Sequence, residues 1–204
     1  MGSAPKKGHL RAERWGIELD ADQLLLLQGL PLDEDLTEED LALLRRYSRT
    51  FTGSYSHTLD GKGRMVVPQA YRDRLGSKFC IAPSADFESF SLYSNLAWAR
   101  LRDRYARLAQ LKAEVIEFQN EFDALSFQGQ ECDGQGRILV PAKIRTRFLG
   151  EEKDVEITGA MDHVRVVAAS RCEEQYRRFK ENLPHIQQVI GELDEAAQNR
   201  NNEN

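Results

Sequence analysis

Asp60-Gly-Lys-Gly-Arg-Met-Val-Val-Pro68 recurs 73 residues further along the chain as Asp133-Gly-Gln-Gly-Arg-Ile-Leu-Val-Pro141. In each copy, two glycines allow a tight turn, because glycine adopts positive φ without a steric penalty. An apolar run follows and ends at a proline, which lacks the N–H group that a strand ladder needs. The sequence therefore predicts two copies of one unit made of a turn and a strand.

Each copy continues outward in the same order. A strand precedes the turn, a second strand follows it, and a short basic helix and two further strands come next. The predicted elements span residues 55–59, 65–67, 69–75, 79–82 and 89–93 in the first copy, and 128–132, 138–140, 142–149, 155–158 and 163–167 in the second. This pattern predicts an α+β fold built from two small β units.

Apolar residues recur every three or four positions after each copy, which predicts two long amphipathic helices. In the first helix one continuous stripe runs from Trp98 to Phe122. In the second, a capping box at Ser170 and Glu173 opens the helix, and Pro184 is expected to break or kink it. We expect the first stripe to pack on the second helix and to help build a subunit interface.

These elements divide the chain into four predicted segments. They are an N-terminal helical extension (1–50), a first repeat with its long helix (51–126), a second repeat with its long helix (127–195), and a disordered polar tail (196–204). Within the extension, helices are expected over residues 20–27 and after a capping box that begins at Thr37.

The charge is unevenly distributed along the chain. The formal net charge is -5, but ten acids and one base lie between Glu13 and Asp40. The basic residues gather in the middle of the chain, around the repeated motif. A DNA duplex responds to the local field within about 8 Å at physiological salt, so a basic face on an acidic protein is compatible with DNA binding.

Several functional classes find no support in the sequence. The longest apolar run, residues 24–27, is far shorter than the roughly 20 residues of a membrane span, and we expect no secretory signal and no membrane association. Three widely spaced cysteines, Cys80, Cys132 and Cys172, suit buried thiols in a reducing cytoplasm. There is no CxxC pair, no P-loop spacing and no catalytic triad motif. We therefore expect no metal, no cofactor, no small-molecule substrate and no enzymatic activity.

Long polar side chains flank the second glycine of each turn. They are Lys62 and Arg64 in the first copy, and Gln135 and Arg137 in the second. Arginine donates two parallel hydrogen bonds to guanine, and lysine and glutamine also contact purine edges, so these residues are candidates for base contacts. The arginines have an equally weighted alternative role in salt bridges within each turn, from Asp60 to Arg64 and from Asp133 to Arg137.

The short helices supply a second set of basic residues. They are Arg72, Arg74 and Lys78 after the first turn, and Lys143, Arg145 and Arg147 after the second. We expect these residues, and the four arginines above all, to contact DNA phosphates beside the turns. A solvated helix face and salt bridges to neighbouring subunits are the alternatives.

The stretches from Phe51 to Pro68 and from Phe127 to Pro141 resemble the two halves of MraZ-family proteins, and the resemblance extends to Phe179. It implies an AbrB-like swapped-hairpin fold of the double-split β-barrel type, with both half-motifs in one chain. It also implies ring-like homo-oligomers on the nucleoid that bind double-stranded DNA at repeated boxes near the promoter of the division and cell-wall gene cluster. The family motif places DNA contacts on Lys62, Arg64 and Arg137.

The leading hypothesis is a sequence-specific, DNA-binding transcriptional regulator. One alternative is a structural or interaction protein that keeps the fold and the ring but lacks specific DNA binding. A second is an AbrB-like antitoxin, for which a toxin partner and a dimer are expected.

Overall fold

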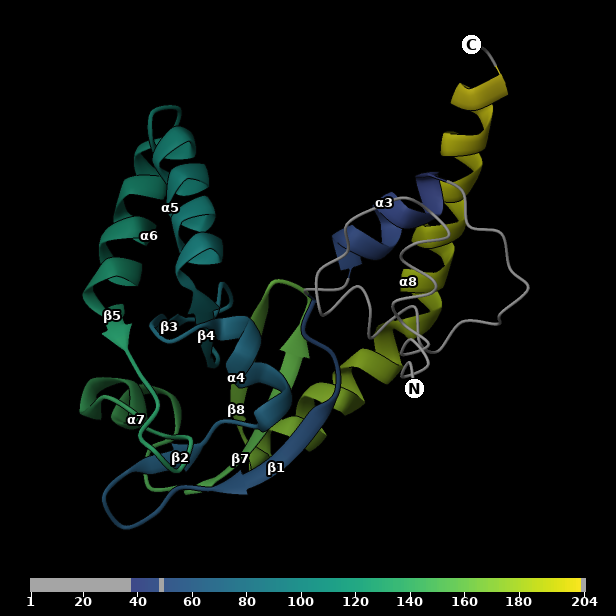
Figure 1. The fold of residues 1–204 in the computed structure, drawn as a ribbon. Coiled ribbons are helices and arrows are strands. Elements are labelled where there is room, and N and C mark those ends of the chain that lie inside the picture. Colours follow the sequence, from purple (N-terminus) through teal and green to yellow (C-terminus); the bar gives the residue numbers. More distant parts are fainter. Residues whose placement is uncertain (1–37, 48–49, 203–204) are drawn as a thin grey trace, which may run out of the picture.

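The computed structural model describes residues 38–47 and 50–202 of the chain (Figure 1). Helix α3 (Glu38–Tyr47) confirms the helix predicted after Thr37, whereas the helix predicted over residues 20–27 lies outside the described residues. Within the described part of the chain, no helix is both long and apolar enough to span a membrane.

The predicted order of elements is confirmed in both copies. The strands are β1 (Ser54–Thr58), β2 (Arg64–Val66), β3 (Phe79–Pro83), β4 (Phe90–Ser94), β5 (Phe127–Gln130), β6 (Arg137–Leu139), β7 (Asp154–Ala160) and β8 (His163–Ala168). The other helices are α4 (Gln69–Leu75), α5 (Asn95–Ala109), α6 (Ala113–Ala124), α7 (Ala142–Phe148) and α8 (Ala169–Asn202). The fold is mixed α+β with antiparallel pairing, as the sequence predicts.

The two copies exchange strands and form one sheet. Its order is β1-β7-β8-β4-β3-β5, so the first strand of each copy pairs with a strand of the other copy. β1 pairs with β7, and β5 pairs with β3, while β4 and β8 join the two halves at the centre. The short strands β2 and β6 form a separate two-stranded ribbon. Neither copy therefore completes its own sheet.

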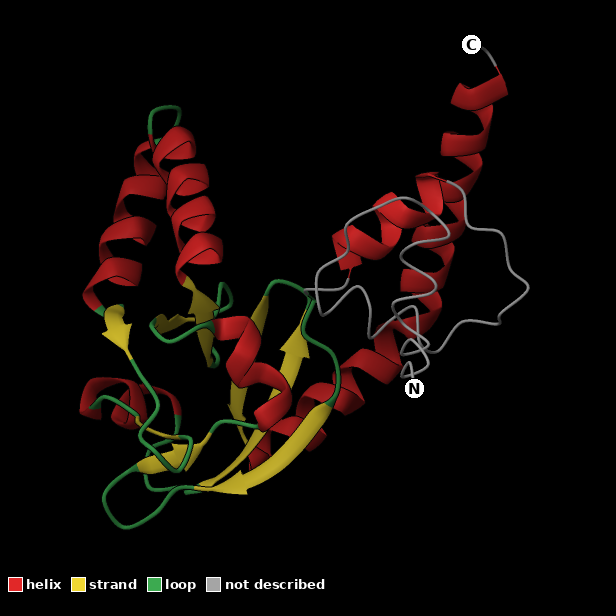
Figure 2. Cartoon of the chain, in the orientation of Figure 1, coloured by secondary structure: helices red, strands yellow, loops and turns green. Residues whose placement is uncertain are grey.

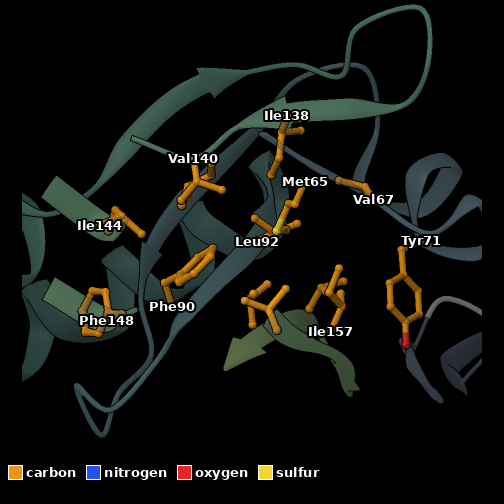
Figure 3. Packing of buried hydrophobic residues seen from close by; sticks show 14 of the residues in the cluster. Met65, Val67, Tyr71, Phe90, Leu92, Ile138, Val140, Ile144, Phe148 and Ile157 are labelled. Carbon is orange, nitrogen blue, oxygen red and sulfur yellow. The ribbon is translucent and has the colours of Figure 1, made fainter. Parts of the chain in front are cut away.

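The β2–β6 ribbon packs on one face of this sheet and closes the main core. Met65 pairs with Ile138 at the centre of the ribbon, and both side chains point toward Leu92 and Ile157 of the sheet (Figure 3). The ribbon alternates strictly, since Met65 is buried whereas its neighbour Val66 is exposed. Both copies thus bury their apolar residues in one shared core, which makes their folding interdependent.

The predicted single helix from Trp98 to Phe122 is wrong, because the segment forms two helices that fold back on each other (Figure 2). The fold-back stacks Trp98 on Phe122, with ring centroids 5.7 Å apart. Both rings also pack on the outer face of β3, against Cys80. Apolar periodicity continues across the break at residues 110–112, so the sequence pattern does not reveal it.

The expected packing of this hairpin on the second long helix is also wrong. Helices α5 and α6 pack on each other and on β3 and β4, whereas α8 packs on β7 and β8. Figure 1 shows the hairpin and α8 projecting from different parts of the sheet. The aromatic residues of the hairpin pack against each other and against the sheet. Their packing therefore does not involve α8.

Helix α8 differs from the prediction at both ends. Glu152 caps its first turn instead of the predicted box, by accepting hydrogen bonds from the Ser170 N–H (2.8 Å) and hydroxyl (2.5 Å). Pro184 lies inside the helix, which continues past it, so the expected break is absent, while the alternative of a kink stays a prediction. The helix continues to Asn202, through residues for which we expected disorder. Ala196, Ala197, Gln198 and Arg200 are residue types that favour helix.

We predict that the ribbon is a main determinant of stability. Met65→Ala should lower the free energy of unfolding by about 2–5 kcal/mol, because it leaves a cavity where both copies meet. Val66→Ala, on the exposed face of the same strand, is the matched control and should change stability by less than about 1 kcal/mol. Urea denaturation followed by circular dichroism measures both, and equal effects would contradict a core role for the ribbon.

Candidate nucleic-acid interface

The first glycine-rich turn is organised around the carboxylate of Asp60. One oxygen accepts hydrogen bonds from the backbone N–H groups of Lys62 and Arg64, both at 2.9 Å. The other oxygen accepts from Nε and Nη2 of the Arg64 guanidinium, both at 2.8 Å. The turn closes when the Gly63 N–H donates to the Asp60 carbonyl (2.9 Å). Gly63 has a φ of 76°, a conformation that favours glycine.

The second turn repeats this arrangement around Asp133. Its carboxylate accepts from the N–H groups of Gln135 (2.9 Å) and Arg137 (3.0 Å), and from Nε (2.9 Å) and Nη2 (2.8 Å) of Arg137. Gly136 has a φ of 75° and donates its N–H to the Asp133 carbonyl at 2.8 Å. The sequence repeat is therefore also a repeat of three-dimensional geometry.

The salt bridges that the sequence allowed as an alternative role for the two arginines are present. The backbone N–H of Arg64 is the main factor that lowers the pKa of Asp60 to about 2. The side-chain hydrogen bond from Arg137 is the main factor that lowers the pKa of Asp133 to about 2. Each pair uses two of the five N–H donors of an arginine. The carboxylate therefore orients the guanidinium, and N–H groups remain on its other edge.

Lys62 and Gln135 occupy the exposed tips of the two turns. The backbone N–H of each of these residues donates a hydrogen bond to the turn aspartate. The backbone from which each side chain extends is therefore held in place. The two positions are equivalent in the repeat but differ in chemistry, since lysine carries a charge and glutamine both donates and accepts hydrogen bonds.

The basic residues of α4 and α7 divide into two groups. Arg74 and Arg147 are exposed, and Arg74 also donates a hydrogen bond to the carbonyl of Thr50 at 2.7 Å. Arg72 and Arg145 are partly buried, and each lies against the turn of the other copy. The sequence grouped all four as phosphate contacts, and the structure separates them by environment.

A hollow lies at each junction between a short basic helix and the segment of the other copy that carries the turn. The first, of about 310 Å³, is lined by Lys62 and Gly63 and by Arg145 and Leu149 of the α7 segment. The second, of about 560 Å³, is lined by Arg72 and Gly76 of the α4 segment and by Glu131 and Cys132. Leu149 follows Gly76 by the repeat offset, so the two hollows are equivalent in the repeat. The first hollow includes the turn itself, whereas the second is lined by the two residues that precede its turn.

Residues 38–47 and 50–202 contain no group of three or more histidine, cysteine, aspartate or glutamate side chains arranged to hold a metal ion. Burial raises the pKa of the Cys80 thiol to about 12 and also raises the pKa values of Cys132 and Cys172. These thiols are therefore protonated at neutral pH and are poor nucleophiles.

The sequence did not predict that Arg72 and Arg145 each contact the turn of the other copy. Arg72 and Arg145 each follow their turn aspartate by twelve residues, and this repeated spacing marks them as a pair. The spacing contains no information about which turn each arginine contacts. The two buried glycines, Gly63 and Gly136, were also seen only as turn formers, although each lies under a guanidinium group.

Comparison with known proteins finds one family and several relatives. A family model described as "MraZ protein, putative antitoxin-like" matches residues 50–119. The transcriptional regulator MraZ of Moorella thermoacetica is 31% identical over 147 residues, which cover 71% of this chain and 99% of that protein. The protein of the same name from Acetivibrio thermocellus is 37% identical over 123 residues, covering 60% and 84%. That from Leuconostoc citreum is 29% identical over 144 residues, covering 71% and 99%.

The lowered pKa of Asp60 predicts a pH dependence of stability. A carboxyl whose pKa falls from 3.8 to about 2 on folding stabilises the protein above pH 3.8, and this stabilisation is lost as the pH falls toward 2. Asp60→Asn should therefore be less stable than the parent protein at pH 7, and the difference should shrink below pH 4. Urea denaturation at each pH measures the difference. Asp73→Asn, at an exposed carboxylate of α4, changes the charge equally and is the control. A difference that is constant between pH 7 and pH 3 would contradict the assignment.

Proposed function

This chain belongs to the MraZ family, and we propose that it is a sequence-specific, DNA-binding transcriptional regulator. The observation that carries the proposal is the pair of matching turns, each of which presents an exposed polar tip and an oriented arginine. The names of the relatives, which are transcriptional regulators, support the same class of function. The interleaved strands of the two copies support the AbrB-like swapped-hairpin fold that the resemblance implies.

Base contacts come from the two turns. Lys62 and Gln135 extend from turn tips that are already ordered by their aspartates, so little further ordering is needed on binding. Arg64 and Arg137 donate from the guanidinium edge that the aspartate leaves unused. The buttressing carboxylate restricts their rotamers, which favours a defined hydrogen-bond geometry over a diffuse charge contact.

Phosphate contacts come from the exposed basic residues of α4 and α7. Arg74 and Arg147 lie in the last turns of these short helices, and Lys143 is exposed on α7. Such contacts hold the protein in register on the duplex without selecting its sequence. Arg72 and Arg145, for which the sequence also predicted phosphate contacts, lie against glycines and enter the proposal through their effect on the turns.

The regulator acts as a ring-like homo-oligomer on the nucleoid and binds repeated boxes upstream of the division and cell-wall gene cluster. Exposed apolar side chains support self-association. On α8 they include Tyr176, Phe179, Ile190 and Leu193, and on the hairpin Leu111 and Ile116. Side chains of this size are rarely left in water over a continuous face, so a second copy of the chain is expected to cover them.

We predict that Lys62→Ala weakens binding to the natural promoter by about 1–3 kcal/mol, which is roughly fivefold to 150-fold in Kd. Lys62 is a sharper probe than Arg64, because removing Arg64 also removes the partner of Asp60. The control is Lys112→Ala, an exposed lysine between α5 and α6. Fluorescence anisotropy with labelled promoter DNA measures both variants. Equal affinity of Lys62→Ala and the parent protein would contradict base contact by Lys62.

We also predict that the number of boxes governs affinity. Footprinting on the region upstream of the gene defines the boxes, and probes then carry one, two or three of them. Each added box makes the next contact intramolecular, so affinity should rise by roughly 10²–10⁴-fold over a single box.

Affinity should also fall steeply as the salt concentration is raised, since phosphate contacts release counterions. Titration of the same probes at two salt concentrations measures this fall. Equal affinity for all probes would contradict a multivalent mechanism. Absence of a footprint would favour the interaction protein over the regulator.

A further inference from the structure

Arg145, which lies on helix α7 of the second copy, contacts the turn of the first copy. Its Nη1 donates a hydrogen bond to the carbonyl of Lys62 at 3.1 Å. The guanidinium also covers Gly63 so closely that a Cβ at position 63 would overlap it. The Lys62 tip is therefore held from two sides, by Asp60 of its own copy and by Arg145 of the other.

Arg72 occupies the equivalent place on the second turn. It lies on α4 of the first copy, and its guanidinium covers Gly136 so that a Cβ there would overlap Nη1. Its Nε is buried and has no hydrogen-bond partner among the described residues. A partly buried guanidinium packed against Gly136 is poorly placed to reach outward to a phosphate, in contrast to the exposed Arg74 on the same helix.

Pairing of β2 with β6 brings each of these arginines to the turn of the other copy. Antiparallel pairing of Arg64 with Leu139 places the first turn beside the end of β6, from which α7 begins. The Val140 N–H donates to the Gly63 carbonyl (3.1 Å), and on the other side the Val67 N–H donates to the Gly136 carbonyl (2.9 Å). Each turn is thus hydrogen-bonded to the strand end that leads into the opposite helix.

We propose that Arg145 and Arg72 are positioning residues that set the geometry of the Lys62 and Gln135 turns from the opposite copy. This inference rests on the proposed function for its effect on DNA. It assigns to these two arginines a task different from phosphate contact, and it makes each DNA-contacting turn dependent on both halves of the chain. One copy alone would lack the guanidinium that covers its turn glycine.

Hydrogen exchange in the DNA-free protein tests whether each arginine orders the turn of the other copy. Arg145→Ala should speed amide exchange at Lys62 and Gly63 by about tenfold or more and leave Gln135 and Gly136 unchanged. Arg72→Ala should give the reverse pattern. Each variant thereby contains its own control in the other turn. Arg145→Lys and Arg72→Lys keep the charge and should show the same pattern, so they serve if an alanine variant unfolds. Uniform changes in both turns, or no change in either, would overturn the proposal.

The salt dependence of DNA binding separates positioning from phosphate contact. Arg145→Ala should weaken specific binding about tenfold or more, with little effect on non-specific DNA and on the slope of log K against log salt. Arg147→Ala should instead reduce the magnitude of that slope by about 0.9 and weaken both kinds of binding alike. If Arg145→Ala behaves as Arg147→Ala is expected to, Arg145 is a phosphate contact and the proposal fails.

Gly63→Ala displaces the guanidinium while Arg145 itself remains. It should weaken specific binding as Arg145→Ala does, and the double variant should be no weaker than the stronger single one. Gly129→Ala is the matched control, because Gly129 has a similar φ of 70° with open space around it. Additive effects of Gly63→Ala and Arg145→Ala would overturn the coupling. If the parent protein binds no DNA, the proposed function fails, whereas the hydrogen-exchange result still decides the positioning role.

Discussion

The pairing of β2 with β6 is the constraint on which the rest of the structure depends. Three residue pairs join the two copies of the repeated motif, with Met65 opposite Ile138 at the centre. One face of this ribbon closes the core over the sheet. Its two ends carry the glycine-rich turns, and each end leads into the basic helix that lies against the other turn. Stability and the candidate DNA surface therefore share one structural origin.

The aspartate of each turn orients the arginine of the same turn and leaves part of its guanidinium group unbonded. Sequence alone gave the turn arginines two roles of equal weight, salt bridge and base contact. The geometry makes these roles compatible, because the carboxylate binds Nε and Nη2 and leaves the other edge of the group unused. The exposed tips, Lys62 and Gln135, take part in the turn only through the backbone. Their side chains can therefore change without disturbing the hydrogen bonds that order the two turns.

The helices show where periodicity misleads. An apolar stripe every three or four residues predicted one helix from Trp98 to Phe122, and a fold-back of two helices satisfies the same pattern. Stacking of Trp98 on Phe122 needs the antiparallel arrangement, which no local signal specifies. Conversely, Pro184 is a strong local signal against helix, and α8 continues through it. Proline removes one hydrogen bond per occurrence, and a helix of this length tolerates that loss.

The sequence by itself determined the repeat, the positions of the strands and short helices, and the residues of the two turns. These features are local, since positive φ at Gly63, an apolar run and a stopping proline act within a few residues. The tertiary structure alone decided which strands of the two copies pair in the shared sheet and which arginine covers which glycine. The sequence does not distinguish Arg72 and Arg145 from Arg74 and Arg147, since all four are arginines of the short basic helices. The position of a residue along a helix does not specify which other segment its side chain contacts. Antiparallel pairing across the ribbon supplies that neighbour, and it does so through contacts between residues more than seventy positions apart.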